Sequence, residues 1–177
     1  MYIPKNAKGK LAAIAVSGPF GAVKEQSSGL YAQTLAERGF LTIAFDPSYT
    51  GESGGQPRYV ASPDINTEDF SAAVDFLSTL DDVDSERIGI LGICGWGGMA
   101  LNAAAMDTRI KATVTSTMYD MSRVNANGYF DAMDADQRYE LRRQLNAQRT
   151  LDAKNGTYEL AGGVVDPLPD DAPQFVK

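Results

Sequence analysis

Four short apolar runs are spaced along the chain, and a turn-forming residue follows almost every one of them. Runs of this length are typical of β-strands, and those without alternating polar residues are typical of strands covered on both faces. The first three runs are continuous, whereas the fourth alternates apolar and polar positions. The predicted strands are Leu11–Val16, Phe40–Phe45, Ile88–Ile93 and Ile110–Thr115.

Helical patterns separate these runs. Residues 28–38 precede Gly39, a position at which glycine commonly closes a helix. Thr67 is expected to cap a second helix, which carries apolar residues on one face. Residues 97–106 are almost wholly small and apolar, which predicts a buried helix. Alternating strands and helices predict an α/β fold with a mainly parallel sheet and right-handed crossovers.

Two stretches fall outside this alternation. Residues 46–66 are rich in Gly, Ser and Pro, and we expect a long functional or mobile loop there. Residues 134–153 predict a polar helix whose four arginines form a solvated face rather than an anion site. We therefore expect a single domain over residues 1–177, in which residues 117–177 form a cap-like helix and an irregular tail.

Composition removes several classes of function. The 177 residues carry a net charge of −7, which argues against nucleic acid as a partner. No apolar run reaches membrane-spanning length and no signal peptide is evident, so we expect no membrane contact and a cytoplasmic location. A single cysteine excludes an internal disulfide and a cysteine-based zinc site, and we expect neither metal nor cofactor. The acidic cluster at residues 81–86 lacks the spacing of an EF-hand and predicts a solvated turn.

The chain has no histidine. A complete Ser-His-Asp or Cys-His-Asp constellation therefore cannot be assembled from these residues alone. Any mechanism that needs an imidazole base must take it from outside this sequence.

The one cysteine lies between the third apolar run and the small-residue helix. The segment Gly92-Ile93-Cys94-Gly95 would place Cys94 on a sharp turn above the carboxyl edge of the sheet. The following helix N-terminus favours a thiolate, and the N–H of Gly95 would face a developing oxyanion. A lone cysteine is more often a small buried hydrophobic residue. The flanking glycines and the position at a strand end favour a nucleophile instead.

Together these segments resemble the α/β-hydrolases, in the branch related to dienelactone hydrolases and X-prolyl-dipeptidyl-peptidase-like hydrolases. Residues 92–94 are similar to that branch's cysteine-containing nucleophile elbow, and residues 17–26 are similar to its first oxyanion loop. Residues 46–55 resemble the loop after the fourth strand of that fold. The resemblance is collinear from about Tyr2 to about Phe130.

The resemblance implies a role for three positions. Cys94 would be the nucleophile and the N–H of Gly95 one oxyanion donor. The second donor would be the N–H of Phe20 or Gly21, because Pro19 has none. The implied fold is a doubly wound α/β-hydrolase core of about four strands, ordered second, first, third, fourth. Its catalytic acid and histidine follow later strands, so the sequence resembles a partial domain truncated at both ends.

Two residues depart from the family pattern or have an ambiguous role. Trp96 stands where the strict elbow has glycine, and we expect it to pack beside the site. Asp120 follows the fourth strand, and we expect a structural role for it. A dinucleotide-binding fold is disfavoured, because the first strand is not followed by G-x-G-x-x-G.

These expectations combine into a function. The chain is predicted to hydrolyse an ester, thioester or activated amide of a small acyl substrate through a Cys94 acyl-enzyme, with an external base. The alternative is a catalytically inactive module for binding or oligomerisation. The second and fourth strands would lie at the ends of the sheet, and the run Phe40–Phe45 has no charge or proline to blunt its edge. A homo-oligomer or a complementing second chain is therefore expected.

Overall fold

The computed structural model describes residues 1–118 and 120–160. Internal contacts divide the chain into two compact units, the first spanning Met1–Ala126 and the second beginning at Asn127. The first unit contains the sheet and its covering helices. The two units are described separately below.

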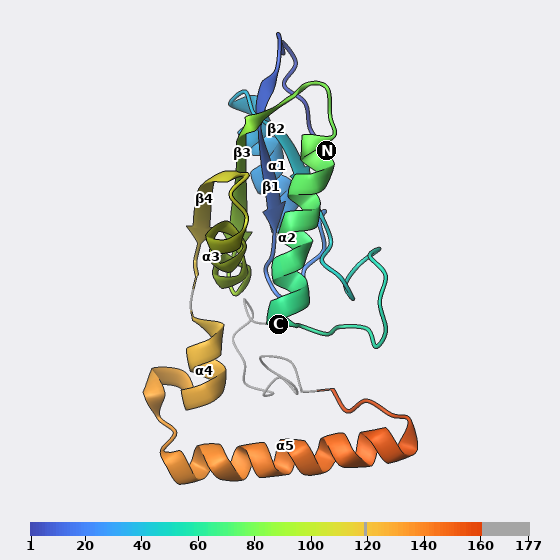
Figure 1. Cartoon of the computed structure of the whole chain (residues 1–177), viewed down its shortest axis with the longest axis vertical. Helices are drawn as coiled ribbons and strands as arrows, with labels where there is room; N and C mark the ends of the chain where they lie inside the picture. Colours follow the sequence, from blue (N-terminus) through green and yellow to red (C-terminus); the bar gives the residue numbers. More distant parts are fainter. Residues whose placement is uncertain (119, 161–177) are drawn as a thin grey trace, which may run out of the picture. The chain divides into compact units, whose positions relative to one another are not determined.

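The first unit is built on four parallel strands in the order β2-β1-β3-β4 (Figure 1). All four predicted strands are present, and both the order and the parallel pairing are confirmed. Consecutive strands run in the same direction because a helix returns the chain across the sheet each time. The strands are β1 (Leu11–Ser17), β2 (Leu41–Ala44), β3 (Val83–Ile93) and β4 (Ile110–Ser116).

The start of β3 differs from the prediction. Val83 pairs with Leu11 ahead of a register shift, so the strand begins five residues before Ile88. Asp84 and Glu86 therefore belong to a strand, whereas the sequence predicted a solvated turn for the whole cluster. Val83 pairs with Leu11 and Ile88 with Ala13, so Asp84 and Glu86 lie in the register shift between these two pairs.

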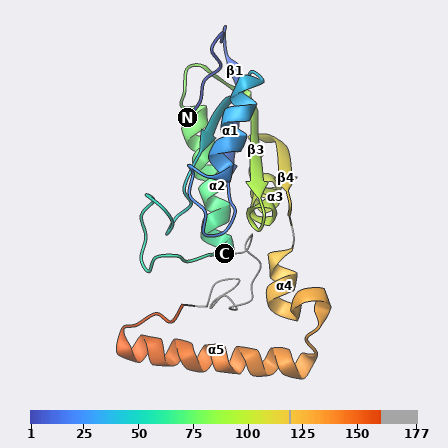
Figure 2. The same cartoon turned by 180° about the vertical axis from the view of Figure 1, so that it is seen from behind.

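Helices cover both faces of the sheet. α1 (Ser27–Glu37) lies on one face, while α2 (Pro63–Ser78) and α3 (Trp96–Met106) lie on the other (Figures 1 and 2). The larger apolar cluster packs on the side of α2 and α3, and a smaller one packs beneath α1. This arrangement confirms the doubly wound architecture.

The N-terminal cap of α2 was misplaced by the sequence pattern. The cap is Ser62, followed by Pro63 at the first helical position, and the Ser62 side chain accepts from the amide of Ile65. Thr67 is instead buried one turn into the helix, where its hydroxyl accepts a hydrogen bond from Asn102. The earlier start shortens the long loop that was expected to reach residue 66.

The N-terminal residues lie along the outer edge of β2. Tyr2 forms an antiparallel bridge with Thr42, in which each amide donates to the other carbonyl at 2.8 and 2.9 Å. This bridge satisfies part of the edge that the sequence left unpaired. The exposed edge of β2 is therefore shorter than the run Phe40–Phe45 suggested.

The chain beyond β4 is helical. The sequence analysis did not predict α4 (Met121–Asn127) or the 3-10 turn η1 (Tyr129–Asp131). It did predict α5 (Ala135–Asn155), which begins with a capping box formed by Asp134 and Gln137. No residue of α5 is buried, in agreement with its polar composition. The predicted tail lies largely outside the described residues.

Bilayer crossing requires a helix that is both long and apolar. Among the described residues, none of the helices has both properties.

Candidate functional site

Cys94 occupies the turn between β3 and α3. Its φ is +62°, a left-handed conformation that side chains other than glycine rarely adopt. β3 ends at Ile93 and α3 begins at Trp96, so only two residues carry the chain from strand to helix. A strained residue on a strand-to-helix turn is the geometry of a nucleophile elbow.

The glycines around Cys94 are required by close packing. A Cβ at Gly92 would overlap the carbonyl group of Trp96, and a Cβ at Gly95 would overlap the ring of Phe20. A Cβ at Gly97 would come within 2.7 Å of the Met118 side chain. The elbow therefore tolerates Trp96 at the position where the strict motif has glycine, while the adjacent Gly97 provides the space.

Cys94 itself is half-buried at the margin of the smaller apolar cluster. Its amide donates to the carbonyl of Ser116 at 2.9 Å, which ties the elbow to the end of β4. The hydroxyl of Ser116 in turn lies 2.8 Å from that of Tyr31 on α1. The elbow is thus anchored to a neighbouring strand and, through it, to a helix on the opposite face from α3.

The predicted oxyanion loop reaches the elbow. The ring of Phe20 lies against the Cα of Gly95, so the structure brings two of the three predicted site residues into contact. Within the described part of the chain, the amides of Phe20, Gly21 and Gly95 donate to no protein acceptor. Such amides are available to an anionic ligand.

Trp96 packs beside the site. It is 2% exposed, and its ring centroid lies 6.2 Å from that of Phe20 and 6.1 Å from that of Phe70. Its indole N–H is buried and finds no acceptor among the described residues. The aromatic contacts therefore place Trp96 between the oxyanion loop and the core of the sheet.

A cavity of about 620 Å³ opens beside the first turn of α3. Gly95 lines it, whereas Cys94 and Phe20 are not among its described lining residues. Its apolar walls come mainly from methionines, which adapt to ligands of varied shape. The lining residues that matter below are Gly95, Met99, Asn102, Met118, Met121 and Asn125.

Asp120 also borders this cavity. Its carboxylate accepts a hydrogen bond from the amide of Arg123 at 2.9 Å, and its carbonyl accepts from the amide of Val124. Both bonds hold the first turn of α4, which is a structural role.

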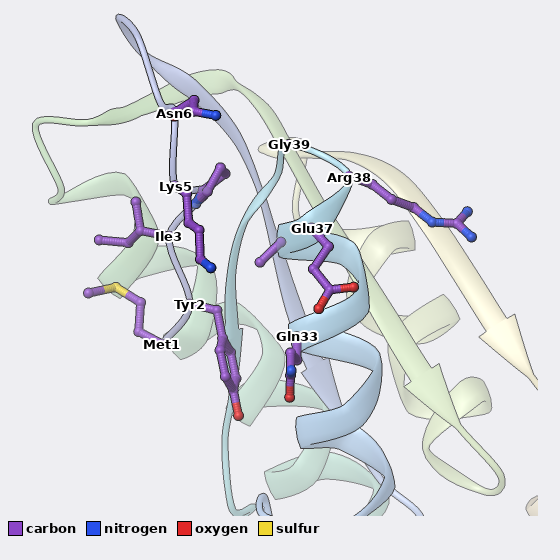
Figure 3. Close-up of a pocket in the computed structure, with 11 residues that line it drawn as sticks. Met1, Tyr2, Ile3, Lys5, Asn6, Gln33, Glu37, Arg38 and Gly39 are labelled. Carbon is purple, nitrogen blue, oxygen red and sulfur yellow. The ribbon is translucent and has the colours of Figure 1, made fainter.

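A larger cavity lies elsewhere, where the N-terminal residues pass the end of α1 (Figure 3). It encloses about 960 Å³ and is lined by Tyr2, Lys5, Gln33, Glu37 and Arg38 among others. Its lining residues come from the N-terminal segment and the second half of α1 with Arg38 and Gly39, and none of them lines the cavity beside α3. The larger cavity contains neither cysteine nor histidine.

One pair of charged residues was missed by the sequence analysis. Lys24 and Asp46 both lie in segments that resemble family loops, but nothing in the sequence connects them. In the structure the Lys24 ammonium lies 2.9 Å from the Asp46 carboxylate, whose side chain is 2% exposed. The only sequence signal was that each follows a strand end, and parallel strands bring such ends to one edge.

The side chains that commonly bind metal ions do not form a cluster within the described residues. No group of three or more Cys, Asp or Glu side chains there is arranged to hold a metal ion.

Comparisons with known proteins agree on the fold. The model of a family described as PET hydrolase-like matches residues 1–141. The Pseudomonas aeruginosa protein PA2218 is 65% identical over 96% of this chain, and its crystal structure superimposes with a TM-score of 0.85. The α/β-hydrolase GrgF of Penicillium shares the fold over 93% of the chain, with a TM-score of 0.74 at 22% identity.

A more distant relative has a named activity. The thiohydrolase aneE of Aspergillus aculeatus is 34% identical over 58% of this chain and 32% of its own length. The chain spans about half the length of these two matches, namely 48% of the PA2218 sequence and 53% of the GrgF structure. The resemblance to α/β-hydrolases is confirmed, and a putative dienelactone hydrolase from Klebsiella pneumoniae shares the fold over 66% of the chain, with a TM-score of 0.54 at 22% identity.

Proposed function

Because the chain belongs to the PET hydrolase-like family of α/β-hydrolases, we propose that it carries the nucleophile of an acyl-transfer hydrolase. The substrate is an ester, thioester or activated amide, and the reaction proceeds through an acyl group on Cys94. The single observation that carries this proposal is the left-handed backbone of Cys94 between β3 and α3. A buried structural cysteine has no need of such a conformation, since an ordinary turn would accommodate it.

The first chemical step is attack of the Cys94 sulfur on the substrate carbonyl. A C–S bond forms, the carbonyl electron pair moves to oxygen, and the amides of Gly95 and of Phe20 or Gly21 stabilise the oxyanion. Collapse of this intermediate breaks the bond to the leaving alcohol, thiol or amine, which takes up the proton lost by Cys94 through solvent.

The second step needs a group that this sequence lacks. Hydrolysis of the thioester requires a base to remove a proton from water, and the chain has no histidine. The general base is therefore supplied from outside these 177 residues. The thiohydrolase name of a relative supports thioesters within the proposed substrate class.

The cavity beside α3 suits the acyl portion of the substrate. It is bounded by Gly95, Met99 and Met118, and its polar lining includes Asn102. An apolar chain with few polar groups would match these walls.

The proposal is tested by incubating the 177-residue chain with p-nitrophenyl acetate. We expect release of no more than one equivalent of nitrophenolate, one acetyl group on Cys94 by peptide mass spectrometry, and almost no turnover afterwards. Cys94→Ala should abolish the burst, and Gly95→Pro should weaken it. A second polypeptide that supplies an Asp and a His to the site should restore turnover.

Two results would overturn the assignment. Repeated turnover by the chain alone would mean that another base operates, and a burst that persists in Cys94→Ala would place the chemistry elsewhere. The complete lack of histidine favours one alternative, a non-catalytic binding or oligomerisation module. Under this alternative, no activated ester would acylate Cys94.

A further inference from the structure

Two loops meet at the carboxyl edge of the sheet beside the elbow. One joins β1 to α1 and contains Phe20, and the other follows β2 and contains Asp46. The Asp46 carboxylate accepts from the Lys24 amide at 2.7 Å and from the Lys24 ammonium at 2.9 Å. A single carboxylate therefore holds the first loop by both its backbone and its side chain.

The second loop is folded around the same carboxylate. The amide of Glu52 donates to Asp46 at 2.9 Å, and the hydroxyl of Ser53 donates to the Asp46 carbonyl at 2.6 Å. Gly51 has a φ of +54°, and a Cβ there would overlap the Asp46 carboxylate. The loop is thus closed tightly over Asp46, which explains why its side chain is 2% exposed.

The first loop is short and compact between its two anchors. The amide of Ala22 donates to the carbonyl of Pro19 at 3.2 Å, and that of Val23 donates to the Gln26 side chain at 3.0 Å. At one end the ring of Phe20 lies on Gly95, and at the other Lys24 is held by Asp46. A displacement at Lys24 is therefore transmitted to the Phe20 and Gly21 amides over only a few bonds.

We propose that Asp46 is a positioning residue which, through Lys24, fixes the Phe20 and Gly21 amides against the elbow in the geometry that binds the oxyanion. Asp46 touches neither substrate nor sulfur in this role. The inference rests on the proposed function of Cys94, because it specifies how the second oxyanion donor is held. Misplacement of a catalytic group by about 1 Å can cost roughly a hundredfold in rate.

The charge state of the pair supports this role. Burial by itself would raise the pKa of the Asp46 carboxyl, but the Glu52 amide and the Lys24 ammonium and amide hold that pKa below its usual range. Hydrogen bonds to Glu52, Asp46 and Glu25 raise the pKa of the Lys24 ammonium. Both partners therefore remain charged throughout the neutral range.

The test compares two reactions of the same sulfur. Acetylation by p-nitrophenyl acetate passes through an oxyanion, whereas alkylation by iodoacetamide does not, so their rate ratio reports on the oxyanion site alone. In Asp46→Asn and in Lys24→Met we expect acetylation of Cys94 to fall about 10- to 100-fold. Alkylation should change less than about twofold, since the elbow itself is intact. Lys24→Arg retains the cation and should recover most of the acetylation rate.

Asp107→Asn is the matched control. Asp107 is also a largely buried carboxylate paired with a cation, Arg109, and it lies at the opposite end of α3 from the elbow. The Asp107→Asn variant should leave the ratio of the acetylation rate to the alkylation rate unchanged. Lys24 is partly exposed, so Lys24→Met tests the inference even if Asp46→Asn does not fold.

The possible failures are distinguishable. If the wild-type chain is alkylated but never acetylated, the proposed function is wrong, and the inference that rests on it is overturned with it. If wild type is acetylated and the two variants keep the same ratio, only the role of Asp46 is wrong. An equal loss in Asp107→Asn would likewise reduce that role to general stability.

Discussion

At the scale of single residues, the site depends on close approaches that leave no room for side chains. Phe20 lies against Gly95 at the first turn of α3, while Gly98, three residues later in the same turn, faces open space. Close packing therefore requires glycine at position 95 but not at position 98. Only the first is fixed by contact with the oxyanion loop.

We predict that Gly95→Ala destabilises the fold by about 1–3 kcal/mol, because the new methyl group must displace the Phe20 ring. Gly98→Ala is the control and should be neutral or stabilising by up to about 1 kcal/mol, since alanine favours the helix. Urea unfolding followed by circular dichroism measures both. Equal effects of the two substitutions would show that the Phe20 contact is not rigid.

The ionised state of Asp46 predicts a dependence of stability on pH. Its pKa is lower in the folded than in the unfolded chain, so its contribution is complete at neutral pH and is lost on acidification. The loss begins near the unfolded value of about 4 and continues below it. The free energy of unfolding should therefore fall less steeply below pH 5 in Asp46→Asn than in wild type. Identical slopes, measured by urea unfolding from pH 7 to pH 3, would show that Asp46 does not contribute.

At the scale of elements, the beginning of α2 is fixed by tertiary contacts. Asn66 is fully buried, and its side chain accepts from the Ser62 amide at 2.8 Å and donates to Asp69 at 2.9 Å. Asp69 in turn accepts from the amide and the hydroxyl of Ser48. The helix start and the preceding loop thus form one hydrogen-bonded unit.

We expect Asn66→Ala to cost about 2–4 kcal/mol, because it leaves the partly buried Ser62 amide without the Asn66 acceptor and removes a partner of Asp69. Glu68→Ala, on the exposed side of the same helix, should change stability by less than about 0.5 kcal/mol. Thermal and urea unfolding of both variants provide the comparison. A loss below 1 kcal/mol in Asn66→Ala would contradict this account of the helix start.

At the scale of the whole molecule, the two ends of the sheet differ. The outer edge of β2 is bridged by Tyr2, whereas β4 has no strand partner on its outer side among the described residues. Val114 of β4 is 54% exposed, and it borders an apolar groove of about 480 Å³ on the sheet face. An exposed strand edge next to apolar surface favours association.

We therefore expect a second copy of the chain to pair with β4. Val114→Lys should shift the population toward monomer, because it places a charge on that edge. Leu30→Lys is the control, since Leu30 is an exposed leucine of α1 away from the edge. Light scattering at micromolar concentration measures the mass. A wild-type chain that is entirely monomeric, with protected β4 amides, would rule this out.

The apolar runs were sufficient to predict the four strands and the three helices between them, because burial on both faces leaves continuous apolar segments in the sequence. The strand order was implied by the resemblance to α/β-hydrolases and not by the runs themselves. Composition likewise determined that no imidazole base is available. The position of Cys94 at the strand-to-helix turn followed from its flanking glycines. The start of α2 could not be predicted from the sequence. Ser62 and Thr67 are equally good caps locally, and the choice between them depends on the burial of Asn66. The pairing of Lys24 with Asp46 was also decided only by the tertiary structure, because charge complementarity between residues 22 positions apart acts only once β1 and β2 lie side by side.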